Sequence, residues 1–323
     1  MPYAIRMHAT GGPEVLRWEE VQVGKPGAGQ VLVRNTAVGL NFVDTYFRSG
    51  LYPSALPTTL GREGAGVVEA VGPKVKEFKP GDRVAYVDPS GSYAELLLRP
   101  AERLVKIPAG ISERTAAAMM LKGMTAEYLL RRTYKVKRGD TILVHAAAGG
   151  VGQILCQWAR HLGAKVIGTV GSEAKIPLAK RAGCRHVLLI GRDKLPEHLR
   201  QITKGAGVPV VYDGVGKDTF MDSLDCLAPL GMMVSYGNAS GAVPPFSPII
   251  LSQKGSLFLT RPTLATYIDK REDLVRSARE LFSLVKRGAV KIAINQTYPL
   301  REAAQAHRDL EARRTTGSTV LLP

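Results

Sequence analysis

The sequence predicts an α/β protein in which a doubly wound, parallel six-stranded sheet of the Rossmann type is joined to a second, mainly β domain. Three observations predict it. An aliphatic run at 141–144 meets a small-residue turn and then an amphipathic segment, as when a parallel strand leads into a helix whose N-terminus can hold a diphosphate. Strand and helix patterns alternate from 139 onward, which indicates a sheet covered on both faces. Residues 1 to about 105 instead show short strands at roughly ten-residue spacing, which favours a barrel or sandwich.

The composition is that of a globular protein of one large or two ordinary domains: 323 residues, 45% hydrophobic and 22% charged. Lys and Arg outnumber Asp and Glu by 44 to 28, a net charge of +16. These cations are spread along the chain and are not interleaved with aromatic residues, so a solvated basic surface is favoured over nucleic-acid binding. The N-terminus lacks the basic-then-apolar design of a signal peptide, and no apolar run approaches the ~18 residues that span a bilayer. We therefore expect a cytoplasmic protein.

The first part of the chain is predicted to be mostly strands, because residues 30–38 alternate with period two and Gly and Pro mark turns between the runs. Residues 39–53 are polar-aromatic and punctuated by Gly and Pro, which is typical of a loop or short helix near a cleft. The period changes after Pro108. The elements expected are strands at 30–38, 64–72 and after the turn at 80–82, and helices starting at 112 and covering 125–134.

The alternating part is predicted from runs of β-branched residues followed by helical periodicity. Its strands are 141–144, 165–170, 187–190, 208–213, 232–236 and 256–260, and its helices are 151–162, 173–182, 194–203 and 217–227. The tail no longer alternates regularly, so we expect it to return to the first domain. Its elements are a helix at 271–287, an extended run at 292–300, a helix at 302–310 and a strand at 319–322.

The small-residue turn resembles a dinucleotide fingerprint, Gly-x-Gly-x-x-Gly, with Ala147, Gly149 and Gly152 at the three positions and Gly150 in addition. In that motif the first Gly allows the turn, the second a close approach to the diphosphate, and the third close helix–strand packing. The motif alone is weak, but its place between a strand and a helix is specific. His145 at the strand end is predicted to be a core or supporting histidine rather than a catalyst.

The end of the second strand indicates which dinucleotide binds. An NAD site places Asp or Glu there to accept from the ribose 2′-hydroxyl. Here Gly171 and Ser172 leave room, and Lys175 follows one turn later, which suits a 2′-phosphate. Glu173 is the competing acid, but it is expected in the first turn of the helix, where it complements the dipole. The predicted cofactor is therefore NADPH.

Several motifs together resemble the quinone oxidoreductase (ζ-crystallin-like) branch of the medium-chain dehydrogenase/reductase superfamily. The resemblance covers essentially the whole chain in one order. It rests on Gly39-Leu-Asn-Phe-Val-Asp, Arg48-Ser-Gly-Leu-Tyr52, the glycine-rich runs at 64–72 and 146–152, Gly81-Asp-Arg-Val, Lys122-Gly-Met-Thr-Ala, Val211-Tyr-Asp and Gly255-Ser-Leu-Phe-Leu-Thr-Arg-Pro262.

The family implies a GroES-like catalytic domain from both chain ends (1–124 and 263–323), a Rossmann domain between them (125–262), and a homodimer. It also implies roles for individual residues. Asn41 and Tyr46 are expected near the nicotinamide, and Tyr52 on the substrate side. The residues expected to form the cofactor cradle are Tyr128, Gly149, Gly150, Val151 and Gly152, and those expected to bind the adenosine phosphate are Gly171, Ser172, Lys175 and Arg313. The residues of the Rossmann domain expected near the nicotinamide end are Tyr236, Gly237, Ser240, Arg261 and Pro262.

Two positions depart from the family pattern. Related bacterial sequences carry Asn-Tyr at the end of the third strand, where this chain has Leu189-Ile190, so an adenosine contact is lost or is supplied by Arg192. Gly214 stands where Ser is common after Tyr-Asp.

A catalytic zinc is not expected. Such a site needs three protein ligands, typically Cys and His. The cysteines, Cys156, Cys184 and Cys226, all lie after residue 150 and are predicted to be buried thiols, and the family's Gly-His-Glu ligand site reads Gly61-Arg62-Glu63. Without a Lewis acid, alcohol oxidation lacks a means of stabilising an alkoxide. Hydride delivery to a conjugated acceptor needs only a donor at the developing oxyanion.

The sequence thus predicts NADPH-dependent reduction of quinones, by hydride or by electron transfer, with Tyr46, Tyr52 and Arg48 as candidate donors. Surface or packing roles are equally open for these three. Two alternatives remain: an enone or enoyl (alkene) reductase of the same superfamily, and an NADPH- or RNA-binding protein with little turnover, which the basic charge would suit. The sequence names neither the acceptor nor the number of electrons transferred per step.

Overall fold

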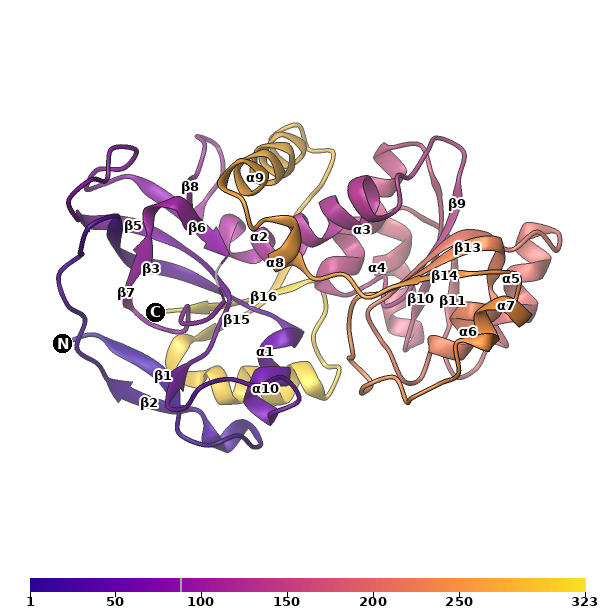
Figure 1. Ribbon diagram of the computed structural model, residues 1–323, viewed down its shortest axis with the longest axis horizontal. Coiled ribbons are helices and arrows are strands. Elements are labelled where there is room, and N and C mark those ends of the chain that lie inside the picture. The colour runs from indigo at the N-terminus through magenta and orange to yellow at the C-terminus, as the bar shows by residue number, and fades with distance from the viewer. Residues whose placement is uncertain (88) are drawn as a thin grey trace. The chain divides into compact units, whose positions relative to one another are not determined.

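The structure, a computed structural model, describes residues 1–87 and 89–323. It divides into two compact units. The first unit contains Met1–Met124, Ile268–Lys286 and Ile292–Pro323, and the second contains Thr125–Tyr267 and Arg287–Lys291 (Figure 1). The predicted catalytic domain resumes at 263, whereas residues 263–267 and 287–291 pack with the second unit. The assignment of separate functional domains stays a prediction.

The second unit is a parallel sheet of six strands in the order β11-β10-β9-β12-β13-β14. Numbered along the chain from β9, this order is 3-2-1-4-5-6, that of the doubly wound dinucleotide-binding sheet, and the predicted fold class is confirmed. The strands are β9 (Thr141–Val144), β10 (Lys165–Val170), β11 (Cys184–Leu189), β12 (Val208–Asp213), β13 (Leu227–Ser235) and β14 (Phe258–Thr260).

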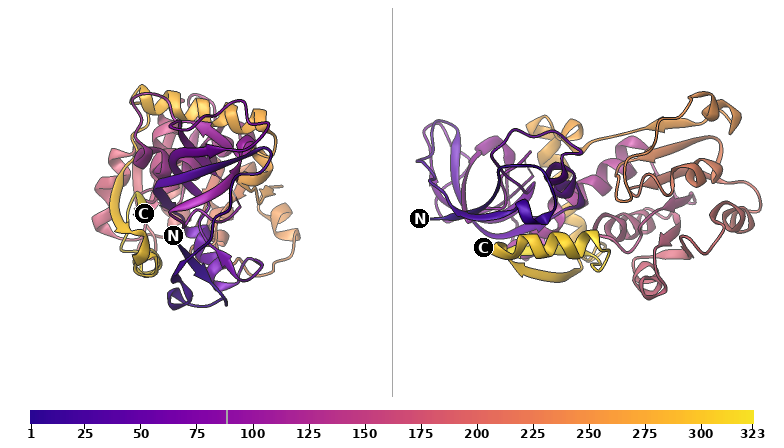
Figure 2. Two further views of the ribbon diagram at one scale, coloured as in Figure 1. Left: turned by 90° about the vertical axis from the view of Figure 1, so that its left-hand side faces the viewer. Right: turned by 90° about the horizontal axis from the view of Figure 1, so that it is seen from below.

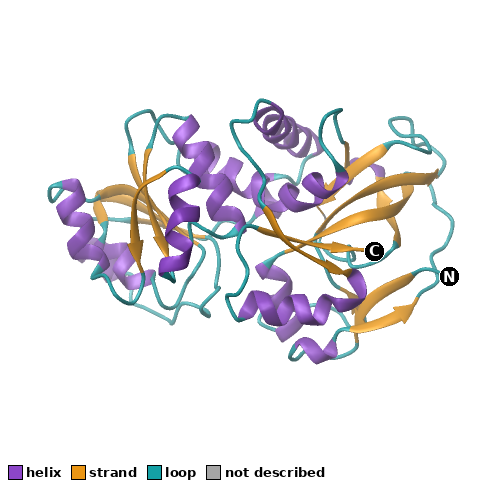
Figure 3. Ribbon diagram, turned by 180° about the vertical axis from the view of Figure 1, so that it is seen from behind, coloured by secondary structure: helices purple, strands orange, loops and turns teal. Residues whose placement is uncertain are grey.

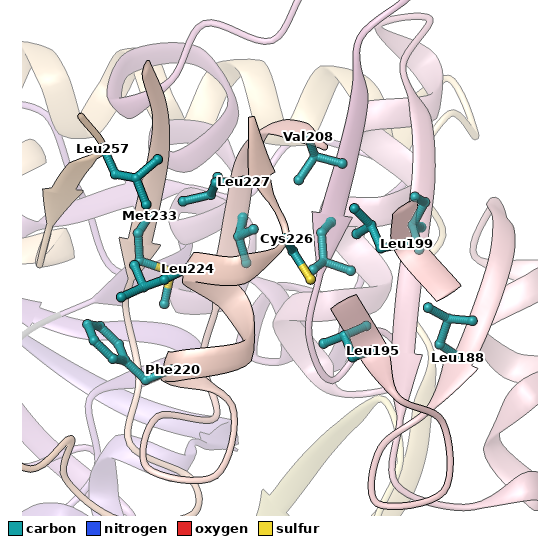
Figure 4. Packing of buried hydrophobic residues seen from close by; sticks show 13 residues of the cluster. Leu188, Leu195, Leu199, Val208, Phe220, Leu224, Cys226, Leu227, Met233 and Leu257 are labelled. Atoms are coloured by element: carbon teal, nitrogen blue, oxygen red, sulfur yellow. The ribbon is translucent and has the colours of Figure 1, made fainter. Parts of the chain in front are cut away.

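Helices cover both faces of this sheet (Figure 3). They are α3 (Gly150–His161), α4 (Ile176–Arg181), α5 (Leu195–Thr203), α6 (Phe220–Asp225) and α7 (Ile249–Gln253); the short helix α8 (Leu264–Tyr267) belongs to the same unit. Leu195 and Leu199 of α5 and Phe220 and Leu224 of α6 pack on the strands in one buried cluster, which also contains Met233 of β13 (Figure 4). Burial of each such side chain contributes about 1.5–3 kcal/mol to the stability of the fold. Each helix therefore turns toward the sheet the face on which its apolar residues recur with helical periodicity.

The first unit is built around β3 (Gln30–Leu40), which pairs antiparallel with β5 (Glu63–Val71), β7 (Leu96–Pro100) and β16 (Ser318–Leu322). The pairing of the last strand with β3 confirms that the tail returns to the first part of the chain, and both termini lie in this unit (Figure 2). The seven-stranded sheet is completed by β6 (Arg83–Val87), β8 (Leu104–Lys106) and β15 (Ile294–Pro299), and β1 (Tyr3–Met7), β2 (Arg17–Glu20) and β4 (Thr58–Thr59) form a second sheet.

Two helices of the first unit, α1 (Phe42–Ser49) and α10 (Ala303–Glu311), contact each other although they are far apart in the sequence. The unit also holds α9 (Arg271–Lys286) and the start of α2 (Glu113–Tyr128). No helix among the described residues is both long and apolar enough to cross a membrane.

The prediction of two helices, one from 112 and one at 125–134, was wrong. The chain forms the single helix α2, followed by a π-helical turn at Leu129–Thr133. The helix runs through Gly123, which packs closely on Leu281: a Cβ atom there would lie 2.5 Å from the Leu281 methyl groups, so a larger residue would require Leu281 to move. The predicted helix at 173–182 is likewise a 3₁₀ turn, Glu173–Lys175, followed by α4.

Candidate active site

The turn between β9 and α3 has the geometry of a dinucleotide cradle. A Cβ atom at Gly152 would lie 2.2 Å from the Ala146 carbonyl oxygen and 2.8 Å from the Ala147 Cα, so only glycine fits where the helix touches the turn. Gly149 caps the helix in an extended conformation. The first-turn N–H groups of Gly150 and Val151 have no acceptor within the helix, and together with the helix dipole they favour an anion.

Alanine at the first fingerprint position is tolerated because the left-handed residue of the turn is Ala146, with φ of 51°, and not Ala147. Ala147 is buried against Gly168 of β10, where a Cβ atom would lie 2.8 Å from the Ala147 Cβ. His145 is fully buried with Thr169 and Ser223 hydroxyls 2.9 Å from its two nitrogens. Burial lowers its pKa, as expected for a core histidine.

The loop after β12 is held in shape by Asp213, a residue that the sequence-based site prediction missed. Its buried carboxylate accepts the Val215 and Gly216 N–H groups at 2.7 and 3.0 Å and the Thr219 hydroxyl at 2.8 Å. The Ser240 hydroxyl donates to the Val215 carbonyl at 2.9 Å, which joins the loop after β13 to this loop. The sequence signal that could have identified Asp213 is an acidic residue at the end of a strand, directly before a Gly-x-Gly sequence.

Gly214, the departure from the family pattern, has a local cause. A Cβ atom there would lie 2.9–3.0 Å from the ring and hydroxyl of Tyr236. A Cβ atom at Gly237 would in turn lie 2.4 Å from the Gly214 carbonyl oxygen. Gly214, Tyr236 and Gly237 therefore form one close contact, and Ser at 214 would require Tyr236 to move.

At the end of β10, Gly171 and Ser172 are followed by the 3₁₀ turn that carries Lys175. A Cβ atom at Gly171 would meet nothing within 4 Å, so the backbone here is open to a ligand. The Glu173 carboxylate pairs with Arg192, and the two side chains are 69% and 70% exposed. Glu173 was predicted in the first turn of a helix over 173–182, but it lies in the 3₁₀ turn before α4, together with Lys175, and pairs with Arg192.

Tyr128 is buried and stacks on Tyr267, with ring centroids 4.3 Å apart, so its ring forms part of the core of the second unit. Burial raises the pKa of its hydroxyl. Arg261 follows β14 and donates to the Ser235 carbonyl at 3.1 Å, and the next residue, Pro262, is buried. The second-unit candidates other than Tyr128 thus gather at the carboxyl ends of β9, β10, β13 and β14, the edge where doubly wound sheets bind ligands.

In the first unit, Asn41 is held by a buried ion pair that the sequence did not predict. The Asn41 amide donates to Glu63 Oε1 at 2.8 Å, and Lys122 Nζ donates to the same oxygen at 2.6 Å. The Leu121 N–H donates to the other oxygen at 2.7 Å. The side chains of Lys122 and Glu63 are 6% and 0% exposed. Gly39 leaves room for the Glu63 carboxylate, because a Cβ atom at this position would lie 2.3 Å from Glu63 Oε1.

Tyr46 and Tyr52 lie together in the first unit. Their rings meet edge-on at 5.3 Å, and the Tyr52 N–H donates to the Tyr46 carbonyl at 3.0 Å. Tyr46 is on α1, which starts immediately after Asn41, so the helix sets the spacing between the Asn41 and Tyr46 side chains. Tyr46 is buried and Tyr52 is half-buried.

Arg48 is corrected from a candidate donor to a packing residue. It is 3% exposed, and its guanidinium donates to Glu311 at 2.7 and 2.8 Å, to His307 at 3.2 Å and to the Gly11 carbonyl at 3.1 Å. Helical periodicity turns this position of α1 toward α10. Arg313 is exposed at the end of α10 with φ of 60°, and its contact with a 2′-phosphate stays a prediction.

The residues present do not fit a catalytic zinc. The position of the family's ligand His is Arg62, whose guanidinium lies 4.9 Å from the Phe47 ring centroid and donates to the Pro89 carbonyl. The three cysteines lie in the second unit, and no cluster of three or more His, Cys, Asp or Glu able to hold a metal occurs in the described part of the chain. The donor set that zinc requires is not assembled at Gly61–Glu63.

Comparison with known proteins matches residues 27–109 to the alcohol dehydrogenase GroES-like domain and residues 150–276 to the zinc-binding dehydrogenase family. A quinone oxidoreductase of Pseudomonas aeruginosa is 55% identical over 325 residues and covers 100% of both chains. The chain belongs to the quinone oxidoreductase family. The resemblance predicted from the motifs is thereby confirmed.

Structures of other family members agree with this. A quinone oxidoreductase of Escherichia coli in complex with NADPH has a TM-score of 0.98 and 49% identity and covers 99% of this chain and 100% of its own. The predictions of an oxidoreductase and of NADPH as its cofactor are confirmed at the level of the family. A 2-haloacrylate reductase of Burkholderia sp. is also 49% identical, over 100% of this chain and 99% of its own.

Proposed function

We propose that the protein reduces quinones with NADPH and without zinc. The observation that carries the proposal is the edge of the parallel sheet, where the Gly149–Gly152 cradle and the Ser172–Lys175 turn lie at the ends of neighbouring strands β9 and β10, in a chain of this family. The cradle would hold the diphosphate, and Ser172, Lys175 and Arg192 the 2′-phosphate. Bound NADPH would supply a hydride from its nicotinamide.

The acceptor side is proposed to consist of Asn41, Tyr46 and Tyr52. Asn41 would orient the nicotinamide, because Glu63 and Lys122 hold its amide in one position. Reduction places negative charge on a quinone oxygen, and a hydroxyl donor at that oxygen would stabilise it. Tyr46, on the helix that begins directly after Asn41, and Tyr52, whose ring contacts Tyr46, are the proposed donors.

Purified protein, NADPH and a panel of quinones, enones and 2-haloacrylates test the proposal, with NADPH absorbance as the readout. Highest kcat/KM with quinones supports it, and highest kcat/KM with the alkenes supports the second candidate, which the 2-haloacrylate reductase among the relatives favours. Binding of NADPH without oxidation by any acceptor would instead favour a binding protein, for which salt-dependent RNA retention is the next measurement.

Lys175→Ala is expected to raise the KM for NADPH roughly tenfold to hundredfold, because a charge-assisted hydrogen bond to phosphate contributes about 1.5–3 kcal/mol. The KM for NADH should stay unchanged. The matched control is Lys180→Ala, an exposed lysine of α4. An unchanged ratio of the two KM values would remove Lys175 from the 2′-phosphate site.

We also propose that two copies associate through β14, as a homodimer. Within the described residues β14 pairs only with β13, and it exposes apolar side chains, with Phe258 56% exposed. An open apolar edge strand is a template for pairing with a second copy about a twofold axis. The cytoplasmic location remains a prediction from the N-terminal sequence.

Phe258→Lys is expected to shift the sedimentation coefficient from that of a dimer to that of a monomer at micromolar concentration. Met221→Lys, at an exposed apolar residue of α6, is the control and should sediment as wild type. Monomeric wild-type protein, or dimeric Phe258→Lys, would contradict the proposed interface.

A further inference from the structure

Asp44 is a buried carboxylate that no cation neutralises directly. It lies on α1 and is fully buried, and its Oδ2 accepts the Asn41 N–H at 2.9 Å and the Tyr93 hydroxyl at 3.0 Å. Its other oxygen, Oδ1, has no hydrogen-bond partner. No salt bridge within the described residues includes Asp44. Such a group is costly to bury, so its presence calls for an explanation.

A chain of hydrogen bonds runs to Asp44 from α10. Tyr93 Oη lies 3.1 Å from His307 Nε2, and His307 Nδ1 lies 3.2 Å from Arg48 Nη1. The guanidinium can only donate, so Nδ1 is the acceptor and carries no proton. The neutral ring then carries its proton on Nε2 and donates it to Tyr93, whose hydroxyl hydrogen is left for Asp44. Every donor in the chain therefore points toward Asp44.

The neutral state of His307 has a physical cause. Burial, and next the charge of Arg48, lower the pKa of His307 to about 3. Arg48 is itself neutralised by Glu311 at 2.7 Å. The direction of the chain is therefore the same over the whole range in which the protein would work.

We propose that Asp44 is a positioning residue that holds Asn41 in place at the nicotinamide, and that Tyr93, His307 and Arg48 anchor Asp44 to α10. The inference rests on the proposed function, because Asn41 acquires this role only if it contacts the cofactor. Asn41 is the N-cap of α1 and is held by three contacts: Asp44 Oδ2 accepts its backbone N–H, its carbonyl accepts the Asp44 N–H at 3.0 Å, and Glu63 accepts its amide. Loss of the Asp44 carboxylate contact opens this capping arrangement and loosens the start of α1, while the Glu63 contact remains.

The arrangement predicts that Asn41 is held in a pH-dependent way. Burial raises the pKa of Asp44 from 3.8 to about 7; hydrogen bonds from Asn41 and Tyr93 and the charge of Arg62 oppose the rise, and the charge of Glu63 adds to it. Oδ2 accepts two hydrogen bonds, so the proton belongs on Oδ1. Ionisation leaves an unsolvated charge, so the folded state loses stability between pH 3.8, where the unfolded carboxyl ionises, and about pH 7, where Asp44 ionises in the folded state. Above about pH 7 the cost of the buried charge exceeds the gain from the two hydrogen bonds, and a shift of α1 would relieve it. We therefore expect NADPH affinity to fall as pH rises above about 7.

The test measures the NADPH dissociation constant by fluorescence from about pH 5.5 to 8.5 without any acceptor, together with kcat and KM for a quinone. Wild type should show one transition near pH 7, with affinity falling up to roughly tenfold per pH unit above it. Asp44→Asn keeps the shape and both accepted hydrogen bonds but does not ionise, so its affinity should stay at the wild-type low-pH value throughout.

Tyr93→Phe removes a hydrogen bond that favours the ionised carboxylate, so its transition should move to higher pH. Tyr86→Phe is the matched control, because it deletes another fully buried hydroxyl, one that donates to Asn35 at 2.8 Å and not to Asp44. Its transition should stay where wild type has it. A general loss of stability would affect both variants alike.

A wild-type transition that persists unchanged in Asp44→Asn, or moves equally in the two tyrosine variants, would overturn the inference. Reduction of no quinone, with the predicted binding profiles intact, would overturn the proposed function and leave the positioning role standing. Absence of NADPH binding to wild type at every pH would overturn both.

Discussion

Lys122→Met is expected to lower the free energy of unfolding by about 3–5 kcal/mol. Lys122 Nζ lies 2.6 Å from Glu63 Oε1, and both side chains are almost completely buried. Removal of the cation leaves Glu63 with only the Asn41 amide and the Leu121 N–H as donors. The stability lost is expected to exceed what the ion pair contributed, because the carboxylate stays buried without its cation and water cannot reach it. Urea denaturation provides the measurement.

The double variant Glu63→Gln/Lys122→Met should recover most of this loss, because it removes both charges and leaves neither unpaired. Lys106→Met is the matched control: its Nζ lies at a similar distance, 2.8 Å, from Asp82, but its side chain is 55% exposed. That change should cost less than about 1 kcal/mol. If Lys122→Met cost no more than Lys106→Met, the buried pair would not stabilise the unit as we argue.

Gly152→Ala is expected to weaken NADPH binding roughly tenfold to hundredfold and to lower the free energy of unfolding by about 1–3 kcal/mol. The new Cβ atom would lie 2.2 Å from the Ala146 carbonyl oxygen and 2.8 Å from the Ala147 Cα. Both are backbone atoms, so no side-chain rotation relieves the clash. The start of α3 must move away from β9, and the first-turn N–H groups move with it.

A graded series separates this effect from a general loss of glycine. At Gly149 the Cβ atom would lie 3.2 Å from the Ala146 carbonyl oxygen, so Gly149→Ala should have a smaller effect. At Gly24 it would meet nothing within 4 Å, and the backbone φ is not left-handed, so Gly24→Ala should bind NADPH as wild type. Wild-type affinity in Gly152→Ala would contradict the proposed cradle.

Most of the second unit could be predicted because each element shows its own local periodicity. Strands β9, β10 and β12 have the predicted bounds, and the Gly turn lies where the fingerprint placed it. Errors occurred where tertiary contacts override local signals. Two helices were predicted between 112 and 134, but the chain forms one continuous helix through Gly123, where the helix packs against Leu281.

The candidate site divides in the same way. Asn41, Tyr46 and Tyr52 came from motifs, and the structure brings the rings of Tyr46 and Tyr52 together and places Asn41 at the start of the helix that carries Tyr46. Glu63 and Lys122 belonged to recognised motifs, but nothing local indicates that they pair across 59 residues of chain. Arg48 was a candidate donor because of its residue type. Only the side of α1 on which it lies shows that its guanidinium binds Glu311 of α10.

The sequence by itself therefore determined the order of the strands and helices, the dinucleotide turn, the family and the lack of zinc ligands. These are properties of residue type and local spacing. Only the tertiary structure decided which buried polar groups meet: Glu63 with Lys122, Arg48 with Glu311, Asp44 with Tyr93, and Tyr93 with His307 across 214 residues. Such contacts depend on strand register and on which helices pack together, and periodicity within a segment carries no information about either.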